Sequence, residues 1–107
     1  MSDRLAAVRD YLTKKPDDRF ALYSLGMELR KRGEWAECFA TFERIIELFP
    51  TYGAGYYAYG AARRESGDAD GARTAWNRGL VALGASDPHT RSELTSALQA
   101  LDEDGEE

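Results

Sequence analysis

Apolar residues recur along most of the chain at spacings of three and four, which is the pattern of amphipathic α-helices. The pattern is interrupted at Pro16, Gly33, Pro50, Gly67 and Gly84, residue types that end helices or begin the next one. The segments that we expect to be helical are residues 2–15, 18–32, 34–48, 52–66, 69–83 and 88–101. The pattern therefore predicts an all-α protein of about six helices, with a single domain over residues 1–101.

The middle of the chain repeats itself after 34 residues. The positions that carry the same or a similar residue at this interval are Tyr23/Tyr57, Gly26/Gly60, Arg30/Arg64, Gly33/Gly67, Phe42/Trp76 and Arg44/Arg78. A fixed interval of this length is typical of stacked helical hairpins, because one hairpin alone cannot bury its apolar face. The repeat predicts two full hairpins, with half a unit before them and a final helix after them.

Gly26 and Gly60 lie inside two of the expected helices, where glycine costs roughly 1 kcal/mol relative to alanine. A helix tolerates that cost where a neighbouring helix has to approach closely. We expect each glycine to form a notch for the bulky residue of its hairpin partner, Phe42 or Trp76. Replacing Gly26 with leucine should push the hairpin apart and unfold the domain.

These residues resemble the tetratricopeptide repeat (TPR) family. The residues that carry the two copies are Leu22, Leu25, Gly26, Leu29, Gly33, Trp35, Cys38, Phe42, Ile45 and Pro50, then Tyr56, Tyr59, Gly60, Gly67, Asp68, Ala72, Trp76 and Leu80. The resemblance covers about residues 19–86, and Arg63, Gly79 and Gly84 depart from the residue types usual in the family. It implies a right-handed α-solenoid whose first helices line a concave groove. In this family such a groove usually binds an extended peptide or a helix of another protein.

A second apolar line on the first helices also points to a groove. The inner stripe of residues 18–32 is already supplied by Leu22, Leu25 and Leu29. The other line, which also begins at Phe20 and Ala54, gives the candidate partner-binding groove: Tyr23, Met27, Arg30, Lys31, Tyr57, Ala61 and Arg64. This set would suit a peptide with an apolar anchor and a carboxylate. Arginine binds carboxylates through two parallel hydrogen bonds, and tyrosine adds contact area at a low entropic cost.

Each of these features also has a purely structural explanation. Phe20 and Met27, and likewise Tyr23 and Tyr57, would pack against neighbouring first helices in any stack. The arginines stand at helix C-termini, where the helix dipole favours cations. The acidic residues 102–107 are expected to form a disordered tail, and the alternative is that this tail docks on the arginines at the helix ends and screens the groove.

The leading hypothesis is therefore an adaptor that binds a peptide segment or a helix of another protein, with acidic groups on that partner. The alternative is a self-associating module, a homodimer, that uses the outer edge of the first helix or the aromatic residues Tyr52, Tyr56, Tyr57 and Tyr59. Nucleic acid is disfavoured as a partner, because the net charge is −5, with 19 acidic against 14 basic residues.

The residue types that carry chemistry do not converge in this sequence. Cys38 occupies a small-residue packing position, and His89 is the only histidine. We expect no catalytic residues, no metal site and no cofactor. One cysteine cannot form an internal disulfide, and neither a signal-like leader nor a membrane span is evident, so a cytoplasmic protein is expected. The richness in alanine, glycine and arginine favours a bacterial source with a GC-rich genome.

Overall fold

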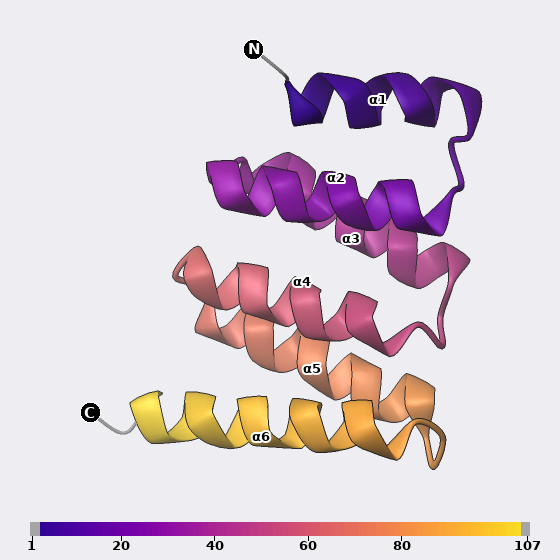
Figure 1. The fold of residues 1–107 in the computed structure, drawn as a ribbon. Coiled ribbons are helices and arrows are strands. Elements are labelled where there is room, and N and C mark those ends of the chain that lie inside the picture. Colours follow the sequence, from indigo (N-terminus) through magenta and orange to yellow (C-terminus); the bar gives the residue numbers. More distant parts are fainter. Residues whose placement is uncertain (1–2, 106–107) are drawn as a thin grey trace.

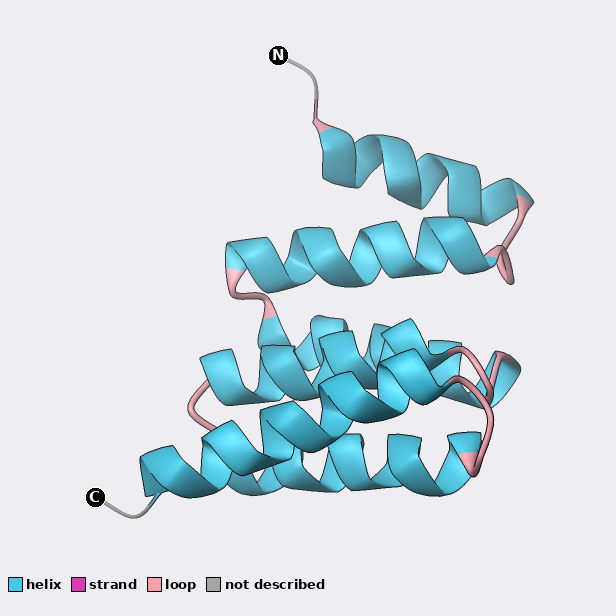
Figure 2. Cartoon of the chain, turned by 60° about the horizontal axis from the view of Figure 1, so that its bottom comes forward, coloured by secondary structure: helices cyan, strands magenta, loops and turns pink. Residues whose placement is uncertain are grey.

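The computed structural model describes residues 3–105, and this range is helical apart from its turns (Figures 1 and 2). Its helices are α1 (Arg4–Lys14), α2 (Arg19–Arg32), α3 (Trp35–Leu48), α4 (Gly53–Glu65), α5 (Ala69–Leu83) and α6 (Pro88–Gly105). No strand occurs within the described range. The prediction of an all-α solenoid of six helices is confirmed.

Two helical hairpins, α2 with α3 and α4 with α5, are stacked on each other. In Figure 1, α2, α4 and α6 lie side by side in the front layer, and α3 and α5 lie behind them. The first helix, α1, lies beyond α2 at one end of the stack, and α6 closes the other end. Each hairpin turns on a glycine with positive φ, 71° at Gly33 and 93° at Gly67, a backbone region that glycine enters without steric cost.

The glycines inside the helices form the notches that the sequence predicts. A Cβ atom placed on Gly26 would lie 2.8 Å from Cζ of Phe42, and one on Gly60 would lie 2.0 Å from Nε1 of Trp76. Both aromatic side chains are buried, and the Trp76 indole N–H donates to the backbone carbonyl of Tyr57 at 3.1 Å. The close approach of the two helices in each hairpin therefore depends on the missing side chains.

Arg63, which departs from the usual residue type of the family, packs over aromatic side chains and forms hydrogen bonds at the edge of the core. Its guanidinium lies over the ring of Phe39, 4.0 Å from the ring centroid. It also donates to the hydroxyl of Tyr59 at 2.9 Å and to the carboxylate of Asp68 at 2.8 Å. A cation over an aromatic face is attracted by the ring quadrupole, so these contacts stabilise the arginine against the aromatic side chains of α3 and α4.

The C-terminal end of α6 differs from the prediction. We expected the helix to end at residue 101 and residues 102–107 to be disordered, but α6 continues to Gly105, and residues 106–107 lie outside the described range. Acidic side chains at a helix C-terminus oppose the helix dipole, so this turn depends on other contacts. Arg73 donates to Asp102 at 2.7 Å, and Arg64 forms an ion pair with Asp104. The segment is therefore an ordered turn held against α4 and α5.

Candidate protein-binding groove

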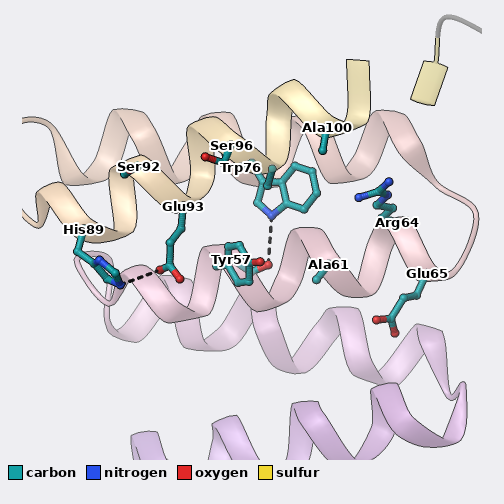
Figure 3. Close-up of a pocket in the computed structure, with 11 residues that line it drawn as sticks. Tyr57, Ala61, Arg64, Glu65, Trp76, His89, Ser92, Glu93, Ser96 and Ala100 are labelled. Atoms are coloured by element: carbon teal, nitrogen blue, oxygen red, sulfur yellow. Dashed lines mark hydrogen bonds and ion pairs between the residues drawn. The ribbon is translucent and has the colours of Figure 1, made fainter. Parts of the chain in front are cut away.

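The layer formed by α2, α4 and α6 carries two depressions that meet at Glu65. The larger, of about 780 Å³, lies between α4 and α6 over Trp76 (Figure 3), and the smaller, of about 480 Å³, runs along α2. Because Glu65 lines both, we call them together the groove. The sequence-predicted residues line it in two sets, Tyr23, Met27, Arg30 and Lys31 in the smaller depression and Tyr57, Ala61 and Arg64 in the larger.

The opposite wall of the larger depression comes from α6, which the repeat predicts only as a final helix after the two hairpins. Ser92, Ser96 and Ala100 face the groove from this helix, together with His89 and Glu93 (Figure 3). The first three of these recur at intervals of four, a spacing that places small side chains on one helical face. This regular run of small residues was the signal in the sequence for the second wall.

The two tyrosines of the groove differ in how far they are open to solvent. Tyr57 is 41% exposed, so its ring is a contact surface on the wall of the larger depression. Tyr23 is half-buried and packs edge-on against Phe42 and Tyr52, with ring centroids 6.3 and 6.0 Å apart. Neither ring is sealed beneath the chain. Tyr23 therefore combines a core contact with a place in the groove lining, whereas Tyr57 is mainly surface.

Two arginines of the groove already form ion pairs within the chain. Arg30 uses two nitrogens on the carboxylate of Glu65, and its Nε lies 2.9 Å from Oε1. This hydrogen bond lowers the pKa of Glu65 and raises that of Arg30. Arg64 pairs with Asp104. Exposed pairs of this kind contribute only about 0.2–1 kcal/mol, so a competing carboxylate can exchange with either partner at little cost.

Two cations that line the smaller depression have no acidic partner within residues 3–105. Lys31 takes part in none of the ion pairs found there, and Arg4, from α1, lines the same depression with no such pair either. Positive charge without an acidic partner in this range therefore gathers at the end of the groove near the C-terminus of α2.

The tyrosines suggested for self-association are mostly part of the core. Tyr56 and Tyr59 are each 2% exposed, and their hydroxyls donate to the carbonyl of Pro50 and the carboxylate of Glu43. Tyr52 is only partly exposed and lies under the guanidinium of Arg19. The expectation of an aromatic self-association surface is wrong for the buried pair, because these tyrosines occupy the inner-stripe positions of the second unit.

The remaining candidate groups offer no reactive site. Cys38 is buried, and burial raises the pKa of its thiol to about 11, so the thiolate form is scarce at neutral pH. His89 lies on the surface 3.9 Å from Glu93. In the part of the chain that the structure describes, no cluster of His, Cys, Asp and Glu side chains is arranged to hold a metal ion. Nor does any described helix combine the length and apolarity needed to cross a membrane.

Stacked hairpins with glycine notches and a groove along the first helices define a helical-repeat protein of the TPR type. The chain is 33% identical over 92 residues to "TPR repeat-containing protein PA0015" of Pseudomonas aeruginosa, and the match covers 85% of this chain and 88% of that protein. Its fold matches the solution structure of protein BPP2914 from Bordetella parapertussis, with a TM-score of 0.81 and 23% identity over 97% of this chain and 91% of that one. No family model matches the sequence. The chain belongs to the TPR repeat-containing proteins, a family of protein-interaction modules that are typically non-catalytic.

Proposed function

We propose that the protein is a small non-catalytic adaptor that binds a peptide or a helix of another protein in the groove. The observation that carries this proposal is the exposed ring of Tyr57 beside the buried indole of Trp76, in a depression large enough for several side chains. Tyrosine surfaces of this kind supply contact area with little loss of side-chain entropy. The expected cytoplasmic location belongs to the same proposal, and it rests on the single cysteine.

The expected ligand has an apolar anchor and a carboxylate. The anchor would lie on Tyr57 and Ala61, and the carboxylate would reach Lys31 or exchange with Glu65 or Asp104 for an arginine. Since each exposed ion pair is worth only about 0.2–1 kcal/mol, most of the affinity would come from the apolar contact, and the charges would select among apolar ligands.

A random peptide library displayed on phage and selected on the whole chain tests this proposal. Peptides that use the groove should lose at least about tenfold in affinity for an Ala61→Glu variant, because a charged side chain would fill the depression. The matched control is Val81→Ser, which changes an exposed apolar residue of α5 outside the groove. If the selected peptides bind Ala61→Glu normally and fail on Val81→Ser, the groove is not the binding site.

A further inference from the structure

Within residues 3–105, no helix pairs with α1 as α2 pairs with α3, so the first hairpin of the stack is incomplete in this range. Displaced by 34 residues, Arg4 and Val8 of α1 correspond to Cys38 and Phe42 of α3. The latter two are fully buried because α2 covers them, with Phe42 in the Gly26 notch. By contrast, α1 has no buried residue, and its backbone packs closely only against α2. Figure 1 shows α1 alone at the end of the stack.

A furrow marks the place where the missing helix would lie. It has a volume of about 320 Å³ and runs between α1 and α2, on the side of the stack that also bears Ser24 of the groove. Its lining is mainly apolar, from Ala7, Val8 and Tyr11 on α1 and Phe20 on α2. Phe20 is 80% exposed and Tyr11 is 45% exposed, an unusual pair of neighbouring aromatic side chains to leave in water.

The other end of the stack is closed by polar side chains. The outer face of α6 carries Thr95 and Gln99, both of them exposed. Leu94 holds the position that corresponds to Gly26 and Gly60, and it is fully buried against α5 and α4. A second copy of this chain therefore does not supply α6 as the missing helix, because the face of α6 that would enter the furrow is already buried within its own chain.

We propose that the furrow between α1 and α2 binds an amphipathic helix of another protein, parallel to α2, with a carboxylate near its C-terminal end that pairs with Arg4. The direction follows from the hairpins, since the first helix of each is antiparallel to the second. Arg4 replaces the small residues Cys38 and Ala72 of the other units, and no acidic group within residues 3–105 pairs with it.

The position of the carboxylate follows from the complete hairpin. In the pair α2 and α3, Sγ of Cys38 lies 3.5 Å from the carbonyl oxygen of Gly26, one helical turn before Arg30 on α2. An acidic residue at the corresponding place on the incoming helix would therefore lie near Arg4. The negative end of that helix's dipole would also point toward this cation. Val8 stands where α3 has Phe42, and its side chain is smaller. The incoming helix therefore needs no glycine at the position that corresponds to Gly26.

The chain itself supplies a probe with these properties. The probe is a fluorescein-labelled peptide of residues 18–32 with the substitutions Gly26→Ala and Arg30→Glu, titrated with the whole protein and followed by fluorescence anisotropy. We expect saturable binding that falls at least about tenfold with Ala7→Glu, which places a charge in the furrow. The matched control, Ala40→Glu, adds the same charge on an exposed position of α3 and should leave binding unchanged.

A charge exchange tests the assignment of Arg4. Arg4→Glu should weaken binding of the glutamate peptide by about three- to tenfold, the range that close exposed charges support. A second peptide that keeps Arg30 should show the opposite preference and bind Arg4→Glu better than the unaltered protein. Equal binding of both peptides to both proteins would overturn the pairing, and loss of binding with Ala61→Glu instead of Ala7→Glu would move the site to the groove.

A tethered version covers the case in which the free peptide binds too weakly to measure. The same segment is joined ahead of Met1 through a Gly-Glu turn copied from positions 33 and 34, which raises its effective concentration to about the millimolar range. The urea midpoint of unfolding should rise, and the rise should vanish with Ala7→Glu. No rise would overturn the proposal. A concentration-dependent dimer of the unaltered chain that Ala7→Glu dissolves would also overturn it, because a second copy would then be the occupant.

Discussion

Substitution of the notch glycines gives the sharpest test of how the hairpins are held. In Gly60→Ala the added Cβ would lie 2.0 Å from Nε1 of Trp76 and 2.4 Å from two of its carbons, so the indole has to move. Movement also breaks the hydrogen bond of the indole to Tyr57. In Gly26→Ala the nearest atom is Cζ of Phe42 at 2.8 Å, and no hydrogen bond of that ring is at risk.

The magnitudes can be set against each other. Alanine gains about 1 kcal/mol over glycine from helix propensity. Overpacking costs roughly 1–3 kcal/mol, and a buried donor left without a partner costs a further 1–3 kcal/mol or so. We therefore expect Gly60→Ala to lower the free energy of unfolding by about 1–5 kcal/mol, whereas Gly26→Ala, with only the first cost, should lower it by about 0–2 kcal/mol.

Urea denaturation followed by far-UV circular dichroism measures both values. The control is Trp76→Phe, which copies the smaller ring of the first unit. In the Trp76→Phe background, Gly60→Ala should lower the free energy of unfolding by at least about 1 kcal/mol less than it does in the parent protein. The reason is that two substitutions at residues in contact are not additive, and their interaction free energy is of this size. Equal losses at the two glycines, or a Gly60→Ala protein as stable as the parent, would refute the notch as the element that sets hairpin spacing.

Further predictions concern the ion pairs and the cysteine. A hydrogen bond from Arg78 lowers the pKa of Glu43 below its usual 4.5, so the stabilisation is present above that pH and lost as the pH falls through the lowered value. The urea midpoint should therefore fall between about pH 6 and about pH 3, and fall less in Glu43→Gln. Asp104→Asn should speed amide hydrogen exchange in the last turn of α6 while changing global stability by less than about 1 kcal/mol. Unchanged protection would show that the turn is held by something else. Iodoacetamide should alkylate Cys38 only as fast as the chain unfolds, and rapid labelling of the folded protein would contradict its burial.

Sequence periodicity is enough to predict this fold because the same local features, a glycine turn and a glycine notch, recur in each hairpin. The glycine turns and the notches at Gly26 and Gly60 depend on contacts within one hairpin, so a residue pattern from one unit also explains the next. The burial of Tyr56 and Tyr59 follows from the same pattern, since they hold the inner-stripe positions of Leu22 and Leu25. Assigning these tyrosines to a surface ignored that periodicity.

The ion-pair partners of the groove arginines, by contrast, could not be predicted from the sequence periodicity. Arg30 meets a residue 35 positions away and Arg64 meets one 40 positions away. These intervals differ from each other and from the repeat, so no periodic pattern in the sequence identifies the partners. They depend on the axial register of neighbouring first helices, which is set by side-chain packing throughout the stack. The same register places α6 beside α4, so the small residues at positions 92, 96 and 100 indicate a small-residue face in the sequence without showing what that face lies against.

The two ion pairs also change what the groove arginines contribute. Arg30 and Arg64 occupy the same place in consecutive units, and each reaches an acidic residue of the next first helix, Glu65 on α4 and Asp104 on α6. Their structural role is to tie adjacent first helices together across one end of the groove. A ligand carboxylate that reaches Arg30 or Arg64, and not Lys31, would then replace an existing partner, which makes the exchange at these two arginines nearly neutral in energy. Most of the affinity in this groove therefore has to come from the apolar surface of Tyr57. The charged residues would contribute mainly to selectivity among apolar ligands.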